Sequence, residues 1–309
     1  MSNFLKNKKI LILGGAGFVG KNIVKHLLEL GARVLVITRF HNKVKISKIY
    51  GQPGQLEIVS TNIFEEGILE KYIYDKFAVI NLCGIMFERE SNDFEKIHVY
   101  LPILIGKICK KNTIPKFIHF SALGASKKSS SLYARSKAAG EMGVLDVYRK
   151  VNILRPSIIF GEGDNFFGQF AKISKYSPFL PLIGPDINFQ PVFVNDIAKA
   201  VVKLLEINDK ASQIYEMGGP KIYSFEDLMN LMLKTLNRRR ILIKLNPRLM
   251  MIPGYFFDFL PKPPFTLDQM KLLMTDNIVN TKMPSFHNLD IQASDLEVLL
   301  PKILKIYKV

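Results

Sequence analysis

Cysteine is scarce in this sequence. Cys83 and Cys109 are the only two in 309 residues, and both lie in apolar runs. A framework of disulfides is therefore not expected, and a reducing compartment fits this usage. The sequence also has no CxxC motif, no histidine-rich tract and no regular spacing of metal ligands, so we assign no metal site.

Long hydrophobic runs are also missing. No apolar stretch reaches the roughly 18–20 residues that a membrane-spanning helix needs. The segment Met1–Lys9 is too short and too polar for a signal peptide, and we expect no organelle presequence unless this is the sequence of a mature chain. Hydrophobic residues still make up 48% of the chain and charged residues 23%, so we expect a folded globular protein.

Acidic residues are few compared with basic ones. The chain has 43 Lys and Arg against 27 Asp and Glu, a formal net charge of +16. Such an excess is typical of proteins with an anionic partner, such as a nucleotide, a nucleic acid or an anionic membrane. Lysine spread along the whole chain supplies most of it, however, and no nucleic-acid-binding motif accompanies the charge. We therefore expect no nucleic-acid partner.

Short apolar runs alternate with helical patterns along the first two thirds of the chain. The predicted strands cover residues 9–13, 33–38, 55–59, 78–82, 116–120, 151–154 and 213–217. The predicted helices cover residues 21–30, 94–111, 131–149 and 195–207. This alternation predicts an α/β fold, a Rossmann-type doubly wound parallel sheet.

Beyond about residue 161 the composition changes, because Pro, Gly and Phe become frequent and proline interrupts the helical patterns. We expect residues 1–160 to form a dinucleotide-binding domain whose sheet is completed by residues 191–217. Residues 161–190 and 218–309 would then form a smaller, interleaved C-terminal α/β lobe rather than a separable domain.

A glycine-rich turn follows the first predicted strand, with Gly14, Gly17 and Gly20 in a GxxGxxG pattern. Such glycines permit a tight strand-to-helix turn, let backbone N–H groups approach a pyrophosphate, and let helix pack on strand. The helix N-terminus adds unpaired N–H groups and the positive end of its dipole. The predicted dinucleotide-binding segment consists of Gly14, Gly15, Gly17, Phe18, Val19 and Gly20.

The second predicted strand ends in Thr38-Arg39, where NAD-binding proteins usually carry a carboxylate for the ribose hydroxyls. A guanidinium at this place can pair bidentately with a 2′-phosphate, and Lys43 follows closely. We therefore expect NADP(H) in preference to NAD(H). The alternative is that Arg39 stacks on the adenine and the site accepts both cofactors.

Tyr133 and Lys137 form a YxxxK motif on a predicted helix, where residues four apart share a face. The lysine can lower the pKa of the tyrosine, and the phenol can exchange a proton with a substrate carbonyl or alcohol. A second match, Tyr72/Lys76, precedes the fourth strand and is interpreted as a surface feature. Tyr133 follows the fifth strand, on the side where the cofactor would end, so we assign the catalytic pair there.

Several segments, taken in order, resemble the extended short-chain dehydrogenase/reductase superfamily. Within it the chain is similar to the atypical subgroup named after a nucleotide-binding accessory subunit of respiratory complex I, alpha subcomplex subunit nine, and its bacterial relatives. The resemblance covers essentially the whole chain. It is carried by Gly14–Gly20, Phe117–Ala125, Tyr133–Glu141, Leu154–Gly161, Asp164–Phe167, Leu180–Gly184, Pro191–Ala198, Tyr215–Pro220 and Leu267–Lys271.

The resemblance implies roles for further residues. Active members use a Ser or Thr after the fifth strand to polarise the substrate oxygen, and Ser121 is near that place, although Leu123 can occupy the actual register. In active members an Asn is usual at the position of His98, where it belongs to a proton relay. Here His98 either substitutes for this Asn, or that part of the relay is lost. Asn62 replaces an Asp that holds the adenine in the family. Cys83 and Gly84 end the fourth strand beside the expected cofactor. Ile158 approaches the nicotinamide end.

Some polar residues have structural interpretations that compete with functional ones. Cys83 is expected to be a small buried hydrophobe, because no cationic partner is evident in the sequence. His119 lies inside a predicted strand and is interpreted as a core or sheet-face residue. Asp196 lies near the start of a helix, where a structural role is expected.

The C-terminal lobe contains an aromatic group and a basic group. The phenylalanines could line an apolar cavity for an isoprenoid or quinone tail, or form ordinary core; they are Phe166, Phe167, Phe170, Phe179, Phe189 and Phe193. The stretch Arg238–Arg248 is basic, and the run Leu249–Leu260 after it is apolar and aromatic. Together they fit contact with a membrane surface or a membrane complex, or a core helix broken at Pro253.

Two functions remain open at this point. The first is an NADP(H)-dependent oxidoreductase or epimerase-like enzyme that acts on an apolar carbonyl, an alcohol or a quinone-related substrate, with Tyr133, Lys137 and Ser121 as catalytic residues. The second is a catalytically weak or inactive nucleotide-binding accessory or assembly subunit of respiratory complex I. We expect a cytoplasmic protein, or one peripheral on the cytoplasmic face of the inner membrane, which is the matrix side in mitochondria.

Overall fold

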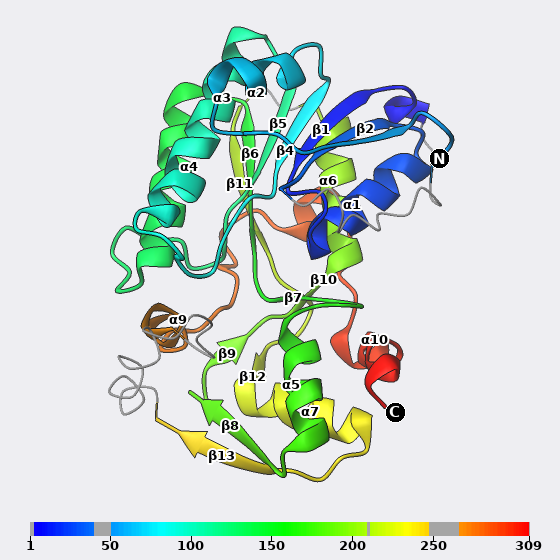
Figure 1. Cartoon of the computed structure of the whole chain (residues 1–309). Coiled ribbons are helices and arrows are strands. Elements are labelled where there is room, and N and C mark those ends of the chain that lie inside the picture. The colour runs from blue at the N-terminus through cyan, green and yellow to red at the C-terminus, as the bar shows by residue number, and fades with distance from the viewer. Residues whose placement is uncertain (1–2, 40–50, 209–210, 247–265, 309) are drawn as a thin grey trace.

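A computed structural model describes residues 3–39, 51–208, 211–246 and 266–308. Its central element is a parallel sheet of seven strands in the order β11-β6-β5-β4-β1-β2-β3 (Figure 1). The strands are β1 (Lys9–Leu13), β2 (Arg33–Ile37), β3 (Leu56–Val59), β4 (Ala78–Asn81), β5 (Lys116–Phe120), β6 (Val151–Pro156) and β11 (Gln213–Met217). The predicted α/β class and all seven strands are confirmed.

Burial explains why these strands are continuous apolar runs. Ile10–Leu13 of β1 and Val34–Ile37 of β2 are buried on both faces of the sheet, as a parallel sheet covered by helices requires. Register then fixes where the strands end: Leu13 lies opposite Ile37 on one side and Asn81 on the other. The carboxyl ends of β1, β2 and β4 therefore meet at one edge.

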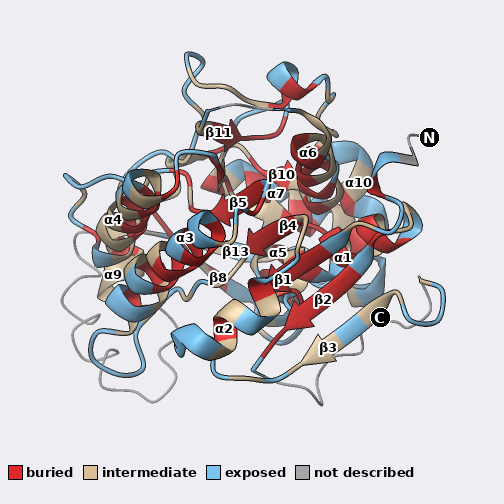
Figure 2. Cartoon of the chain, turned by 90° about the horizontal axis from the view of Figure 1, so that it is seen from above, coloured by how far each residue is buried: buried red, intermediate tan, exposed pale blue. Residues whose placement is uncertain are grey.

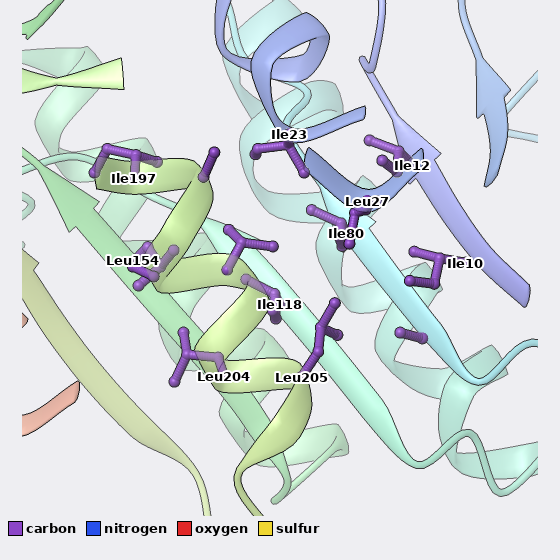
Figure 3. Packing of buried hydrophobic residues seen from close by; sticks show 14 of the residues in the cluster. Ile10, Ile12, Ile23, Leu27, Ile80, Ile118, Leu154, Ile197, Leu204 and Leu205 are labelled. Carbon is purple, nitrogen blue, oxygen red and sulfur yellow. The ribbon is translucent and has the colours of Figure 1, made fainter. Parts of the chain in front are cut away.

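Helices cover both faces of the sheet (Figure 2). One face packs on α1 (Phe18–Glu29) and α6 (Val194–Glu206). Figure 3 shows Leu204 and Leu205 of α6 over Ile118 of the sheet, and Ile23 of α1 near Ile12. The opposite face packs on α2 (Glu66–Ile73), α3 (Leu101–Lys111) and α4 (Leu132–Val147).

The fourth and fifth strands are linked by a helix that starts irregularly. The predicted helix over residues 94–111 is a π-helix, η3 (Glu95–Tyr100), followed by α3. Its carbonyl at His98 lies close under α4, because a β-carbon on Gly140 would stand 1.8 Å from that oxygen. Glycine at position 140 thus permits the two helices to touch.

A smaller lobe lies beyond the carboxyl edge of the sheet (Figure 1). Its strands pair in twos: β7 (Ile159–Phe160) with β10 (Val192–Phe193), β8 (Phe179–Ile183) with β13 (Ile241–Leu245), and β9 (Asn188–Phe189) with β12 (Tyr223–Ser224). Its helices are α5 (Phe166–Tyr176), α7 (Phe225–Leu236), α9 (Leu267–Leu272) and α10 (Leu296–Ile303), with a short 3-10 turn η5 (Leu304–Tyr307). Two other 3-10 turns, η1 (Asn3–Leu5) and η4 (Phe286–Leu289), pack on the core of the sheet domain. The predicted domain boundaries at residues 160, 190 and 217 stay a prediction.

The phenylalanines of this lobe pack mainly on one another. Phe166 lies 5.0 Å from Phe167 and 5.7 Å from Phe170, centroid to centroid, and Phe189 joins the same buried cluster. Phe179 is 48% exposed. Of the two interpretations left open, the structure supports ordinary core for this group, with Phe179 as the exception.

Of the residues given structural interpretations, His119 and Asp196 are buried, whereas Cys83, expected to be buried, is only half-buried. Both cysteines are free thiols. His119 is buried in β5 and accepts a hydrogen bond at Nδ1 from the Asn81 amide, 3.2 Å away. Asp196 is fully buried in the first turn of α6, where it accepts the Ser294 N–H at 2.7 Å and pairs with Lys199. These contacts fit the structural roles expected from the sequence.

Candidate functional site

The glycine turn between β1 and α1 is shaped by close backbone contacts. Gly14 has φ of +79°, and a β-carbon there would stand 3.2 Å from the carbonyl carbon of Leu82. A β-carbon on Gly20 would stand 2.5 Å from the Gly15 Cα. Side chains at these positions would push β4 or α1 away, so the turn needs glycine for its geometry.

Gly17 is the N-cap residue of α1, and its N–H donates to the Gly14 carbonyl at 3.1 Å. Among the described residues no side chain caps this helix end, and its first turn has no acidic residue. Helix starts of this kind present N–H groups and a positive dipole end to an anion. The geometry of the turn is therefore compatible with the pyrophosphate binding predicted from the sequence.

A cavity of about 550 Å³ opens in front of this turn, at the carboxyl edge of β1, β2 and β4. Its volume lies within the range of about 300–1,000 Å³ typical of small-molecule sites. The walls combine the turn, the end of β2, the segments after β3 and β4, and the start of α3. Its lining residues are Gly14, Ala16, Gly17, Lys21, Ile37, Thr38, Arg39, Thr61, Ile63, Phe64, Leu82, Cys83, Gly84, Ile85, Ile97 and Leu101.

Five of the predicted cofactor residues line the cavity: Gly14, Gly17, Arg39, Cys83 and Gly84. Other predicted residues pack behind the cavity wall or lie away from the cavity. Gly15 and Gly20 pack against one another under the turn, Phe18 lies 3.2 Å from a β-carbon placed on Gly161, and Val19 packs on the core. The carbonyl of Ile158 accepts the Val192 N–H, at the start of the smaller lobe.

Asn62 is exposed and does not line the cavity, where its neighbours Thr61 and Ile63 do. Its side-chain oxygen accepts the Phe64 N–H at 3.1 Å, an Asx turn that shapes the loop after β3. The adenine contact assigned to Asn62 from the resemblance stays a prediction, and the structure offers Thr61 beside it.

The end of the cavity at β2 is basic. Thr38 and Arg39, which directly follow β2, line it, and Lys21 lines it from the start of α1. Lys21 was missed by the sequence analysis. The backbone N–H of Lys21 donates to the Gly17 carbonyl at 3.0 Å, so Lys21 lies one helical turn beyond the N-cap. This spacing from Gly17 could have indicated that Lys21 faces the cofactor site. Lys43 lies outside the described residues.

The other end of the cavity reaches the predicted catalytic pair. A β-carbon on Gly84 would stand 3.1 Å from the Lys137 Nζ, so the lysine lies directly behind the cavity wall. Lys137 is 4% exposed and donates to the Phe120 carbonyl at 3.3 Å. Its nitrogen lies 5.9 Å from the centroid of the Tyr133 ring. The structure therefore brings Gly84, Tyr133 and Lys137 together.

Burial sets the protonation of this pair. It raises the pKa of Tyr133 to about 12 and lowers the pKa of Lys137 to about 8, although Cys83 and Glu141 act on the lysine in the opposite direction. Near neutral pH the phenol therefore holds its proton, while the lysine is close to its titration point. Burial also raises the pKa of Cys83 to about 11, which fits a neutral thiol rather than a nucleophile.

His98 has both ring nitrogens engaged. Its Nε2 accepts the Ile85 N–H at 3.1 Å, so the proton is on Nδ1, which donates to Ser136 Oγ at 2.8 Å. Ser136 in turn donates to the Tyr133 carbonyl. Burial, then the charge of Lys137, lowers the pKa of His98 to about 2. This side chain ties the loop after β4 to α4 and has no nitrogen left to carry a proton onward.

Ser121 directly follows the carbonyl that holds Lys137. It is buried, and within the described part of the chain its hydroxyl has no hydrogen-bond partner. Leu123, two residues further, is buried and donates its N–H to the Pro156 carbonyl at 3.0 Å. An unpartnered buried hydroxyl at the carboxyl end of β5 is available to a ligand oxygen.

A carboxylate from far along the chain reaches the helix that carries this pair. Asp268 of α9 contacts the N-terminus of α4. Asp268 lies in the family-like segment Leu267–Lys271, and nothing in the sequence indicated a role for it. No spacing in the sequence links it to Tyr133, which lies 135 residues away.

The basic stretch of the smaller lobe is partly used within the protein. Arg238 donates to the Ala171 carbonyl and to Ser174 Oγ near the end of α5, at 2.7 and 2.9 Å. Arg240 donates to the Ser174 carbonyl, and Lys244 pairs with Glu226 at 2.7 Å. These contacts weaken the case for a membrane-binding cluster at these residues, and the apolar run Leu249–Leu260 lies outside the described residues.

The sequence of this chain is similar to sequences of known proteins. The model of the NAD dependent epimerase/dehydratase family matches residues 10–218. The chain is 30% identical over 300 residues to the mitochondrial NADH dehydrogenase (ubiquinone) 1 alpha subcomplex subunit 9 of Mus musculus, covering 95% of this chain and 79% of that protein. The corresponding subunit of Arabidopsis thaliana is 31% identical over 312 residues, with 96% and 75% covered. The resemblance found in the sequence is confirmed.

Among solved structures, the Bordetella bronchiseptica enzyme WbmG in complex with NAD and UDP is similar, with a TM-score of 0.72. Its sequence is 16% identical, and the match covers 96% of this chain and 93% of that one. This likeness shows the fold. Within the residues that the structure describes, no helix is both long and apolar enough to cross a bilayer.

Proposed function

The chain belongs to the NAD dependent epimerase/dehydratase family, and on that premise we propose that its cavity binds a nicotinamide dinucleotide, NADP(H) in preference to NAD(H). The protein is then an oxidoreductase or epimerase-like enzyme with Tyr133, Lys137 and Ser121 as catalytic residues. The observation that carries this proposal is the continuity of one cavity from the glycine turn to Gly84, whose other side touches Lys137.

The residues present fit such a ligand. The turn offers a cradle without side chains, in which Gly17 starts a helix whose first N–H groups can hold a pyrophosphate. Ser121 supplies a buried hydroxyl that lacks a partner among the described residues. WbmG was solved in complex with NAD, and a fold shared with it supports the same class of ligand here.

The preference for NADP(H) is supported by charge. Arg39 and Lys21 both line the cavity where the adenosine ribose would lie, and two cations beside Thr38 favour a 2′-phosphate over bare hydroxyls. Among the cavity-lining residues there is no carboxylate to accept ribose hydroxyls.

Proton transfer is the part of the chemistry that this chain's own residues supply. A bound nicotinamide supplies the hydride donor or acceptor. The phenol of Tyr133, a half-buried residue, has a raised pKa and so keeps its proton near neutral pH, and it can donate that proton to a substrate oxygen. The pKa of Lys137 is lowered to about 8. Its side chain can therefore take up a proton and stabilise the phenolate of Tyr133, and release the proton once the phenol is restored. Ser121 can donate a hydrogen bond to the same oxygen.

Apolar surroundings support an apolar substrate. Tyr133 contacts Phe94 edge to face, with the ring centroids 6.0 Å apart, and the neutral ring of His98 at 5.4 Å. A carbonyl, alcohol or quinone-related compound fits these neighbours better than a charged one.

Loss of label from stereospecifically deuterated NADPH tests this function. The purified chain is incubated with the labelled cofactor and with candidate quinones or lipid ketones. Exchange that disappears in Tyr133→Phe, with NADPH still bound, supports the enzyme. Tight NADPH binding without exchange for any candidate contradicts it.

A second function is favoured by one observation, the similarity over 95% of the chain to a complex I subunit. On this proposal the chain is an accessory or assembly subunit of respiratory complex I, and the bound nucleotide stabilises its fold. It would then be peripheral at the inner membrane, on the matrix side in mitochondria, and otherwise cytoplasmic. Co-purification of the native chain with complex I subunits supports this role, and its absence from the isolated complex contradicts it.

A further inference from the structure

Asp268 binds the N-terminus of α4, the helix that carries Tyr133 and Lys137. Its Oδ2 accepts the Ser131 hydroxyl at 2.7 Å and the Tyr133 N–H at 3.0 Å. Its Oδ1 accepts the Leu132 N–H at 2.6 Å. One carboxylate thus satisfies two backbone donors of the first turn, including that of Tyr133 itself.

The helix has no acidic residue of its own in this turn. Its N-cap, Ser131, already accepts the Ala134 N–H at 3.3 Å, so the remaining N–H groups need another acceptor. A negative charge at this end also complements the helix dipole. By contrast, α7 has its own acidic capping residue, Asp227. The start of α4 therefore depends on a charge supplied from another part of the chain.

The element that carries Asp268 is itself held in place. A capping box between Thr266 and Gln269 starts α9, with N–H to oxygen distances of 3.1 and 3.2 Å. Met270 is fully buried. Figure 1 shows α9, on the side of the smaller lobe toward the sheet domain, below the end of α4.

Five residues after α9, Asn277 fixes the same segment to the sheet domain. Ser157, after β6, donates its hydroxyl to the Asn277 side-chain oxygen at 2.7 Å, and the Asn277 amide donates to the Leu123 carbonyl at 3.4 Å. The segment from Asp268 to Asn277 therefore connects α4 with the ends of β5 and β6. A movement of α9 relative to Asn277 would therefore displace the first turn of α4.

We propose that Asp268 is a positioning residue for the Tyr133–Lys137 pair. It holds the backbone of residue 133 at the place from which the phenol reaches a substrate oxygen, and it acts through α4 without touching the ligand. The proposal rests on the proposed function in naming Tyr133 as the proton donor, while the contact itself is independent of it.

The test compares two isosteric substitutions in the full chain, Asp268→Asn and Asp276→Asn. Asp276 lies on the same segment and accepts both the backbone and the side-chain N–H of Asn188, at 2.9 and 3.3 Å, so it is the matched control. We expect Asp268→Asn to lower kcat about tenfold or more, with KM and the Kd for NADPH within about twofold of wild type. Asp276→Asn keeps wild-type values, and Asp268→Glu restores part of kcat.

A spectroscopic measurement keeps the proposal testable if no turnover is found. 3-Fluorotyrosine is placed at position 133, and its ¹⁹F resonance is recorded at several pH values. Asp268→Asn shifts this resonance and Asp276→Asn does not. An unchanged resonance and kcat in Asp268→Asn, or equal changes in both variants, would overturn the positioning role. Absent turnover together with the expected ¹⁹F shift would instead count against the enzyme function alone.

Discussion

The ammonium group of Lys137 lies directly behind the backbone of Gly84, so that a β-carbon on the glycine would stand 3.1 Å from Nζ. This contact joins a nearly fully buried lysine to the wall of the cavity. Because Gly84 has no side chain, only its backbone separates the charge from a ligand. Electrostatic interactions are stronger in such a poorly solvated place than at the surface.

The first prediction concerns the pH dependence of stability. Burial lowers the pKa of Lys137 to about 8, whereas an unfolded lysine titrates near its model value of 10.5. Between these values the unfolded chain holds a proton that the folded chain has released, so raising the pH stabilises the fold. From pH 8 to 10, wild type should gain about 2 kcal/mol over Lys137→Met in denaturant unfolding.

The control for this measurement is Lys111→Met. A hydrogen bond from Lys111 to Glu70 raises the pKa of that lysine, so its contribution to stability is lost only at higher pH. Its difference from wild type should not grow between pH 8 and 10. A flat difference for Lys137→Met as well would contradict the buried, partly neutral state of Lys137.

The second prediction concerns the choice of cofactor. Removal of the guanidinium in Arg39→Ala should raise the Kd for NADPH about tenfold, which corresponds to about 1.4 kcal/mol, and leave the Kd for NADH within about twofold. Arg33→Ala is the matched control, because Arg33 is exposed at the start of β2, at the end of the strand away from Arg39. Equal losses for both cofactors would instead support stacking of Arg39 on the adenine.

The third prediction concerns the packing of the glycine turn. A β-carbon on Gly20 would meet Gly15 backbone atoms at 2.5–2.6 Å, so Gly20→Ala should lower the free energy of unfolding by about 1–3 kcal/mol. Gly67 is the second residue of α2, and nothing lies within 4 Å of its β-position. Gly67→Ala should therefore stabilise the protein by up to about 1 kcal/mol. Similar effects of the two substitutions in urea titrations would refute this difference in packing.

The fourth prediction concerns the ion pair that joins α4 to β6. Arg155 donates to Glu141 through two nitrogens, at 2.8 and 2.5 Å, and Glu141 is 3% exposed. Glu141→Gln leaves the guanidinium with the more distant Glu216, and we expect a loss of roughly 3 kcal/mol. Glu70→Gln, at a surface pair with Lys111, should keep an unfolding midpoint close to wild type. A midpoint for Glu141→Gln that is equally close to wild type would show that the pair is dispensable.

The sheet was predictable because each central strand is a continuous apolar run that burial on both faces requires. The glycine turn and the YxxxK pair were predictable for a similar reason, since their geometry depends on residues close together in sequence. The π-helix at Glu95–Tyr100 was not, because its composition suits an ordinary helix equally well.

Contacts between distant residues could not be read from spacing. Asp268 reaches Tyr133 across 135 residues, and the side chain of Asn62 accepts the Phe64 N–H of its own loop. His98 was left open as a relay residue, and only its two partners, Ile85 and Ser136, show that both nitrogens are engaged. Such choices depend on tertiary packing.

Binding of NADPH to wild type and to Gly17→Asp, measured by titration calorimetry, tests the central claim most directly. Gly17 is an exposed N-cap with φ of −73° and ψ of 177°, a place that aspartate favours, so the variant should fold and keep its thermal midpoint. Its carboxylate would stand where the pyrophosphate must bind. We predict saturable binding to wild type and at least about a hundredfold weaker binding to the variant. Equal affinities for the two proteins, or no binding to wild type, would contradict the account.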